Sequence, residues 1–226
     1  MPKDSALNKA LVIFSGGLDS TVCLYLAKKD FLHVEALSFD YNQKHKIELS
    51  KAKRIAKKLE ISQTIIKISS EIFLGSSLID KDLKVPKKSL NKNKLPNTYV
   101  PGRNILFLSY AVSFAESRNI GNILIGVNAL DFSGYPDCRP DFIQSFQNMV
   151  NLGIRGNDKS SIQIKTPLLS LTKKDIVLLG DKLNVPINLT HSCYDPIKSK
   201  PCGECDSCLL RKRGILEAKL SNKYDI

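Results

Sequence analysis

The fold of this chain is decided by residues 11–26, which read LVIFSGGLDSTVCLYL. The apolar run predicts a buried strand over 10–14, and the Ser-Gly-Gly turn after it leads into a predicted helix over 20–29. Such a turn between a strand and a helix presents backbone N–H groups and the positive end of the helix dipole to an anion. The stretch therefore predicts a phosphate-binding loop in an α/β fold.

The residue types in this loop suit the phosphates of a nucleotide. Gly16 and Gly17 let the backbone approach a phosphate closely. Ser15 and Ser20 add hydroxyl donors, and Asp19 can hold a magnesium ion against the phosphates. The loop is not a Walker A motif, because the chain contains no Gly-Lys-Ser/Thr triplet. The alternative interpretation is a serine- and glycine-rich turn without a ligand.

Strands and helices alternate through the rest of the chain. Further strands are predicted over 33–39, 64–68, 122–127 and 162–165, and helices over 45–60, 105–117, 141–152 and 173–183. This order predicts a single α/β domain with a parallel, doubly wound sheet, and Thr172 with Asp175 predicts a capping box. Ligands of such sheets bind beyond the carboxyl ends of the strands. We therefore expect one crevice formed by residues that follow strands, namely Ser15, Asp40, Asn128 and Thr166.

Composition places the chain among ordinary globular proteins. Its 226 residues suit one domain, with 42% hydrophobic and 25% charged residues. The first residues lack a signal-peptide pattern, and no apolar run is long enough to span a membrane, so we expect a cytoplasmic protein with no membrane partner. The net charge of +12 suits nucleic-acid binding, attraction of ATP and other anions, or solubility. Because aromatic residues are not interleaved with the basic ones, no direct nucleic-acid partner is expected.

Four of the six cysteines form a cluster near the C-terminus, with the spacing C-x8-C-x2-C-x2-C: Cys193, Cys202, Cys205 and Cys208. In a cytosolic protein this spacing indicates metal binding rather than disulfides, and four thiolates favour a closed zinc site. An iron–sulfur cluster and a redox pair are the alternatives. Cys208 is expected to open a final helix over 209–220. We divide the chain into an ATP-binding α/β domain, 1–190, and a zinc-binding helical segment packed on it, 191–226.

The loop at 15–20 resembles the PP-loop of the ATP pyrophosphatase family, whose members split ATP between its α- and β-phosphates. The resemblance implies a Rossmann-like sheet of the adenine nucleotide α-hydrolase type. It also implies adenylation, in which a substrate oxygen attacks the α-phosphate and pyrophosphate leaves. ATP and Mg²⁺ are then the expected cofactors, beside Zn²⁺. The implied ATP-binding residues are Phe14, Ser15, Gly16, Gly17, Leu18, Asp19, Ser20 and Thr21.

Four further segments narrow the resemblance: residues 40–45 (DYNQKH), 99–104 (YVPGRN), 129–140 (ALDFSGYPDCRP) and the cysteine cluster. With the PP-loop they resemble the 7-cyano-7-deazaguanine synthase family of queuosine biosynthesis. Asn42 and Phe132 depart mildly from its pattern, and the lysine-rich loop at 80–94 matches none of its motifs. The resemblance implies an ATP-dependent ligase that forms carbon–nitrogen bonds. It would convert 7-carboxy-7-deazaguanine and ammonium to the nitrile through an adenylated carboxylate and an adenylated amide, as a homodimer.

Site roles follow as predictions. Asp19 and Arg103 are the candidate catalytic residues, with Arg103 as a charge clamp on phosphate or carboxylate and a surface arginine as its alternative. The candidate substrate-binding residues share the long loop before the fourth predicted helix: Asp131, Tyr135, Asp137 and Arg139. An acid there can accept the ring N–H groups of a deazaguanine, and Arg139 can meet the substrate carboxylate. Packing of the loop is the alternative role for all four.

Three more residues, Cys23, Cys138 and His45, have side chains capable of chemistry. Cys23 is expected to be a core residue, and Cys138 is expected to be a packed thiol, because adenylation followed by ammonia attack needs no covalent nucleophile. His45 is either a base, an adenylate contact or a structural residue.

Other functions remain as alternatives. A PP-loop enzyme acting on tRNA, such as a tRNA thiolase or a lysidine-forming ligase, fits the basic charge but would be expected to carry an RNA-binding domain. A zinc-ribbon nucleic-acid-binding module fits the cysteines but not the intact Ser-Gly-Gly-Leu-Asp-Ser loop. A glutamine-dependent amidotransferase is disfavoured because the chain leaves no room for a glutaminase domain, so free ammonium is the expected nitrogen donor.

Overall fold

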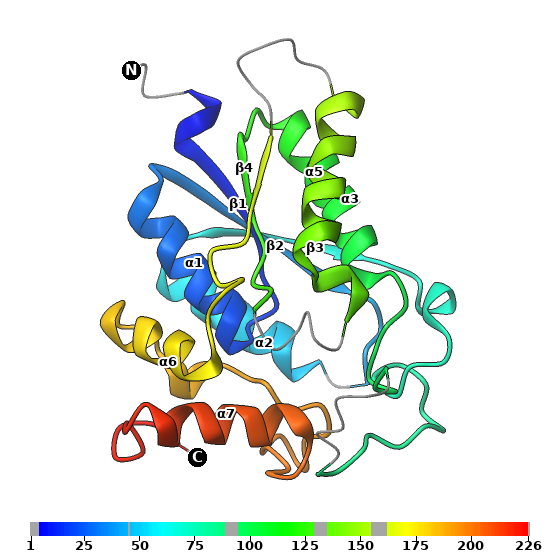
Figure 1. Ribbon diagram of the computed structural model, residues 1–226, viewed down its shortest axis with the longest axis vertical. Coiled ribbons are helices and arrows are strands. Elements are labelled where there is room, and N and C mark those ends of the chain that lie inside the picture. The colour runs from blue at the N-terminus through cyan, green and yellow to red at the C-terminus, as the bar shows by residue number, and fades with distance from the viewer. Residues whose placement is uncertain (1–4, 45, 89–94, 129–134, 155–161, 226) are drawn as a thin grey trace.

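The computed structural model describes residues 5–44, 46–88, 95–128, 135–154 and 162–225. Five parallel strands form one sheet in the order β3-β2-β1-β4-β5 (Figure 1). The strands are β1 (Lys9–Ile13), β2 (His33–Asp40), β3 (Ser62–Lys67), β4 (Asn122–Leu124) and β5 (Gln163–Lys165). The order reverses between β1 and β4, as in a doubly wound sheet, and this confirms the predicted fold class.

Helices cover both faces of the sheet. They are α1 (Leu18–Asp30), α2 (Ile47–Lys58), α3 (Arg103–Ser117), α5 (Pro140–Gly153), α6 (Lys173–Lys182) and α7 (Asp206–Glu217). Short 3₁₀ turns lie at Ala6–Asn8, Ser70–Phe73, Pro136–Cys138 and Ile187–Leu189. Within the described ranges, none of the helices combines the length and the apolar character that crossing a membrane requires.

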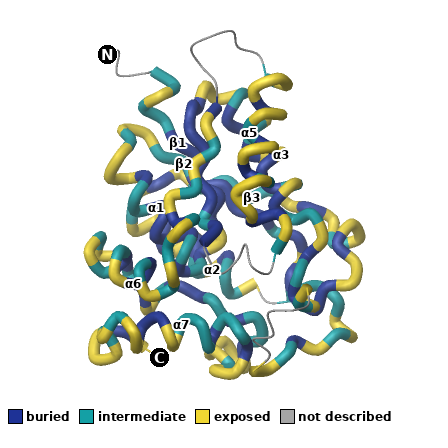
Figure 2. The backbone as a smooth tube through the Cα atoms, viewed as in Figure 1, coloured by how far each residue is buried: buried dark blue, intermediate teal, exposed yellow. Residues whose placement is uncertain are grey.

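The two cores follow from the alternation of side chains along the strands. In β1, Leu11 and Ile13 pack with the buried residues of α3 and α5. Ala10 and Val12 point to the other face, where they pack with α1, α2 and α6. Buried backbone accordingly runs through the centre of the molecule, and the outer sides of the helices are exposed (Figure 2). Cys23 is fully buried in the second core, as expected from the sequence.

Several element boundaries differ from the sequence predictions, and those of α1, β4 and α7 have a local physical reason. Helix α1 begins at Leu18 with Gly17 as its N-cap, so Asp19 lies in its first turn, where a carboxylate complements the helix dipole. Strand β4 ends at Leu124, since β5 pairs with it over only three residues. Helix α7 covers Asp206–Glu217, so Cys208 lies inside its first turn rather than opening it. The predicted capping box is confirmed, because Thr172 and Asp175 bond reciprocally at the start of α6.

Candidate active site and metal centre

The loop between β1 and α1 is closed by its own hydroxyl groups. The Ser15 N–H donates to Ser20 Oγ at 3.3 Å, and the Gly17 N–H donates to Ser15 Oγ at 3.2 Å. Thr21 Oγ1 donates to the Gly17 carbonyl at 2.6 Å from a fully buried position. The two serines therefore stabilise the turn, and Thr21 stabilises it through the Gly17 carbonyl.

Gly16 is the one position of the loop where a side chain has no room. Its φ of +84° lies in the left-handed region, and a Cβ would stand 2.7 Å from both the Ala52 nitrogen and the Glu48 oxygen of α2. On the other side, the His191 N–H donates to the Gly16 carbonyl at 3.0 Å. The loop is thus packed between α2 and the segment that precedes the cysteine cluster.

Asp19 projects from the first turn of α1 and is held by two partners. Lys173 Nζ lies 2.8 Å from both of its carboxylate oxygens, and Asn128 Nδ2 donates to Oδ2 at 3.1 Å. Lys173 is the first residue of α6, and Gly214 of α7 leaves space for it, since a Cβ there would stand 2.7 Å from Lys173 Cγ. The pair is shielded, with the side chains 15% and 24% exposed for Lys173 and Asp19.

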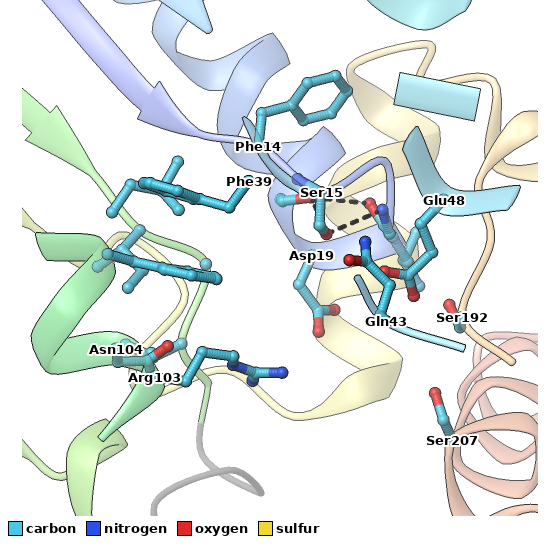
Figure 3. A pocket seen from close by; sticks show the side chains of 18 of the residues that line it. Phe14, Ser15, Asp19, Phe39, Gln43, Glu48, Arg103, Asn104, Ser192 and Ser207 are labelled. Atoms are coloured by element: carbon cyan, nitrogen blue, oxygen red, sulfur yellow. Dashed lines mark hydrogen bonds between the residues drawn. The ribbon is translucent and has the colours of Figure 1, made fainter. Parts of the chain in front are cut away.

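A cavity of about 230 Å³ opens at the carboxyl ends of β1, β2 and β4 (Figure 3). Of the predicted site residues, eight line it: Phe14, Ser15, Gly17, Leu18, Asp19, Ser20, Arg103 and Tyr135. Asn128 reaches the loop through Asp19. Asp40 and Thr166 are not among the lining residues, and the Asp40 carboxylate instead accepts the Asn42 N–H at 3.1 Å and pairs with Lys46 at 3.1 Å. The expected crevice therefore exists, but only some of the strand-end residues form it.

Arg103 enters the cavity from the start of α3, directly after Gly102, whose φ is +62° (Figure 3). Its guanidinium interacts electrostatically with several groups, among them Tyr41, Tyr135 and Tyr194. A guanidinium presented among tyrosine hydroxyls can clamp an anionic oxygen from several directions. The position of Arg103 fits the predicted charge clamp.

The long loop before α5 is only partly described. Asp131 and His45 lie outside the described residues. Asp137 is buried, and its Oδ2 accepts the Asn104 N–H at 3.0 Å, so its carboxylate caps the first turn of α3. Arg139 is exposed at the start of α5 and does not line the cavity.

Tyr135 and Cys138 belong to the same loop, and both line the cavity. Cys138 is 4% exposed, and Asn104 Nδ2 donates to its sulfur at 3.2 Å. The thiol is therefore packed and bonded, in agreement with the expectation for Cys138.

The four clustered cysteines meet at one point. Their Sγ atoms all lie within 4.8 Å of one another, and three of the four residues are buried. Backbone N–H groups of Tyr194, Asp195, Cys202 and Cys205 point at these sulfurs over 3.2–3.4 Å. Such donors stabilise thiolates, and four thiolates at this separation suit the tetrahedral closure of a metal ion. The residues fit a closed four-sulfur metal site.

Part of the lysine-rich loop docks on this cluster. Lys87 pairs with Cys205 in an isolated antiparallel bridge, and the Lys88 N–H donates to the Glu204 carbonyl at 2.9 Å. Lys87 Nζ lies 2.7 Å from Asp195 Oδ2, and Val85 packs among the buried cysteines. Residues 85–88 thus form one wall of the metal site, a role that no motif indicated.

The segment that carries the four cysteines, residues 191–208, also borders the cavity. Residues 191, 192 and 194 line it just before or after Cys193, and Ser207 lines it just before Cys208. Arg211 of α7 holds the residues just before this segment in place, because its guanidinium donates to Thr190 Oγ1 and to the Ile187 carbonyl, each at 2.7 Å. A metal ion bound by the four cysteines would therefore hold residues 191–194 and Ser207 at the edge of the cavity.

Sequence reasoning missed several cavity residues: Tyr41, Gln43, Glu48, His191, Ser192, Tyr194 and Ser207, as well as Lys173 beside Asp19. One signal was available for Glu48. It precedes Ala52, Ile55 and Leu59 by four, seven and eleven positions, so a carboxylate lies on the apolar side of α2. For the others, only the fold brings distant segments to the same edge of the sheet.

Known proteins resemble this chain over nearly its whole length. The model of the family described as queuosine biosynthesis protein QueC matches residues 9–219. A 7-cyano-7-deazaguanine synthase from Leptospira interrogans is 59% identical over 97% of this chain and 91% of its own length. Another protein of that name, from Solidesulfovibrio magneticus, is 48% identical over 96% and 95% of the two chains. Among solved structures, an NMN synthetase from Francisella tularensis shares the fold, with a TM-score of 0.52 and 20% identity over 95% of this chain and 85% of its own.

Proposed function

The chain belongs to the family described as queuosine biosynthesis protein QueC, and we propose that it is an ATP-dependent ligase that makes 7-cyano-7-deazaguanine. Its substrates are 7-carboxy-7-deazaguanine, ammonium and ATP. The observation that carries the proposal is the high identity, over nearly the whole length of both chains, to proteins named 7-cyano-7-deazaguanine synthase. The cavity beside a PP-loop supports the same conclusion.

The PP-loop is proposed to bind the β- and γ-phosphates of ATP, which leave as pyrophosphate. The backbone N–H groups at the start of α1 and the Ser15 and Ser20 hydroxyls supply donors to the anion. Asp19 is the proposed ligand of a magnesium ion, which when bound neutralises charge on the leaving pyrophosphate. Lys173, held 2.8 Å from Asp19, is proposed to donate to a phosphate oxygen once Asp19 turns to the metal.

The chemistry explains why an acid must be adenylated. A carboxylate is a poor electrophile because its leaving group would be oxide, and attack of its oxygen on the α-phosphate gives AMP as the leaving group instead. Ammonia then forms the amide, and a second adenylation, on the amide oxygen, permits elimination to the nitrile. Arg103 is proposed to stabilise the charge that develops on phosphate or carboxylate in both rounds.

The remaining site residues receive narrower roles. Tyr135 borders the cavity near Arg103 and is proposed to contact the substrate ring. Asp131 remains a proposed acceptor for the ring N–H groups. Asp137 is proposed to act through the start of α3, because its carboxylate is already bonded to Asn104. Arg139 would need the loop to move inward before it met a substrate carboxylate.

Zinc is the proposed occupant of the four-cysteine site, with Cys193, Cys202, Cys205 and Cys208 as ligands. Four thiolates leave no open coordination position, so the proposed role is structural. The site would hold residues 191–194 and Ser207 against the cavity. We also propose that the enzyme acts on free small molecules in the cytoplasm, as a homodimer and without contact to nucleic acid.

The test is release of AMP and pyrophosphate from ATP and Mg²⁺ with 7-carboxy-7-deazaguanine and ammonium, with bulk tRNA as a parallel acceptor. Release with the small molecule and formation of the nitrile are expected. Asp19→Ala should abolish ATP consumption, whereas Asp30→Ala, at the exposed end of the same helix, should not change it. Release only with tRNA would retain PP-loop chemistry and refute the proposed substrate.

A further inference from the structure

Glu48 supplies a second acid to the cavity, on the side opposite the start of α3. It lies in the first turn of α2, and its side chain points into the cavity together with Gln43 (Figure 3). Its backbone carbonyl lies against the PP-loop, because a Cβ on Gly16 would meet that oxygen at 2.7 Å. Glu48 therefore lies beside the PP-loop, and its side chain lines the same cavity as Ser15 and Asp19, where the proposed adenylate forms.

The carboxylate of Glu48 is available for a ligand. Across the described ranges, neither a hydrogen bond nor an ion pair within 4.0 Å joins it to another side chain. Gln43, by contrast, is already engaged, since its Oε1 accepts the Tyr41 N–H at 3.1 Å. A half-buried carboxylate without a bonded partner is a strong acceptor for a small cation or an N–H group.

The charges around Glu48 favour a base near neutrality. Burial raises the pKa of the Glu48 carboxyl to about 7, and the positive charge of Arg103 opposes this rise. The other titratable groups that line the same cavity come from several elements: Tyr41 after β2, Asp19 of α1, Tyr135 and Cys138 before α5, and His191 and Tyr194 before α7. Arg103, as the proposed anion clamp, and Glu48 thus give the cavity one cationic and one anionic wall.

We propose that Glu48 binds the ammonium ion at the PP-loop and removes one of its protons, which releases ammonia beside the adenylated substrate. This inference rests on the proposed function, because it assigns the nitrogen donor of that reaction. An ammonium ion, like a lysine side chain, keeps its proton at neutral pH and has no lone pair for attack. A cavity that takes ammonium from solution therefore needs a base.

The step balances as follows. Ammonium gives a proton to the Glu48 carboxylate, which leaves ammonia and a neutral carboxylic acid. The ammonia lone pair forms the carbon–nitrogen bond at the acyl carbon, the bond from that carbon to the adenylate oxygen breaks, and AMP leaves with the electron pair. The added nitrogen then loses a second proton to water and becomes the neutral amide.

Glu48→Gln keeps the shape of the side chain and removes the base, and Glu71→Gln, at an exposed position, is the matched control. Three rates are measured for each protein at pH 7. They are pyrophosphate–ATP exchange with the carboxylate substrate and no ammonium, kcat/KM for ammonium, and formation of the hydroxamate from hydroxylamine. Hydroxylamine is uncharged at neutral pH and needs no base to expose its lone pair.

For Glu48→Gln we expect unchanged exchange, a fall of about 100-fold or more in kcat/KM for ammonium, and hydroxamate formation at the wild-type rate. The deficit with ammonium should shrink as pH rises and free ammonia accumulates. Loss of exchange or of hydroxamate formation in the variant, or unchanged use of ammonium, would overturn the assignment. Absence of exchange in the wild-type protein would instead refute the proposed function, so the two failures are distinguishable.

Discussion

Replacing Gly16 by alanine tests whether the PP-loop is locked against α2. Two effects add at this position: the left-handed φ of +84°, and a Cβ 2.7 Å from two backbone atoms of α2. Gly75 is the matched control, because its φ of +83° is nearly the same and a Cβ there meets nothing within 4 Å. The two variants therefore share the strain and differ in the contact.

The magnitudes follow from this comparison. Gly75→Ala should lower the free energy of unfolding by about 1.5 kcal/mol, which is the cost of a left-handed conformation for a residue with a Cβ. Gly16→Ala should lower it by about 3.5 kcal/mol, since forcing backbone apart adds about 2 kcal/mol. At about 3 °C per kcal/mol for a chain of this size, the unfolding temperatures should fall by about 5 °C and about 10 °C.

Thermal and urea unfolding, followed by circular dichroism, measure both values. Equal shifts for the two variants would refute the reasoning, because they would mean that α2 yields to a Cβ without cost. A Gly16→Ala protein that unfolds like the wild type would also contradict the positive φ. The expected result is a difference between the variants of about 2 kcal/mol, attributable to the contact with Ala52 and Glu48.

Further predictions concern Asp19, the metal and the buried acid. Lys173→Met should reduce pyrophosphate–ATP exchange at least about tenfold, because the PP-loop loses the cation beside Asp19. Lys174→Met, at the exposed neighbouring position, should have no effect on this exchange. Equal exchange rates in the two variants would contradict the role of Lys173. Removal of the metal by a chelator should lower the unfolding temperature by more than about 10 °C and weaken ATP binding. Addition of one equivalent of zinc should restore both properties. An unchanged unfolding temperature after chelation would rule out a structural metal. Glu48→Gln should match the wild type in stability near pH 4 and exceed it above pH 7, by on the order of 1–3 kcal/mol, because a raised carboxyl pKa means that the folded protein resists ionisation. Equal stability of these two proteins at pH 8 would show that Glu48 ionises without cost.

Local sequence patterns predict much of the fold. The apolar run of β1, the glycines after it and the capping box at Thr172 act over a few neighbouring residues, and each was predicted where the structure has it. The cysteine spacing likewise brought four sulfurs together as expected. Element ends were less predictable. The limits of β4 and α7, for example, depend on a short partner strand and on a cap at Cys205.

The sequence by itself determined the doubly wound sheet, the PP-loop and the four-cysteine cluster, because each depends on periodicity or on residues adjacent in the chain. Only the tertiary structure decided that Lys173 meets Asp19 across 154 positions, that Lys87 bonds Asp195 across 108, and that Glu48 faces the same cavity as Arg103. The physical reason is that a parallel sheet brings the carboxyl ends of distant strands to one edge. Side chains meeting there come from separate helices, and their contacts depend on how those helices pack.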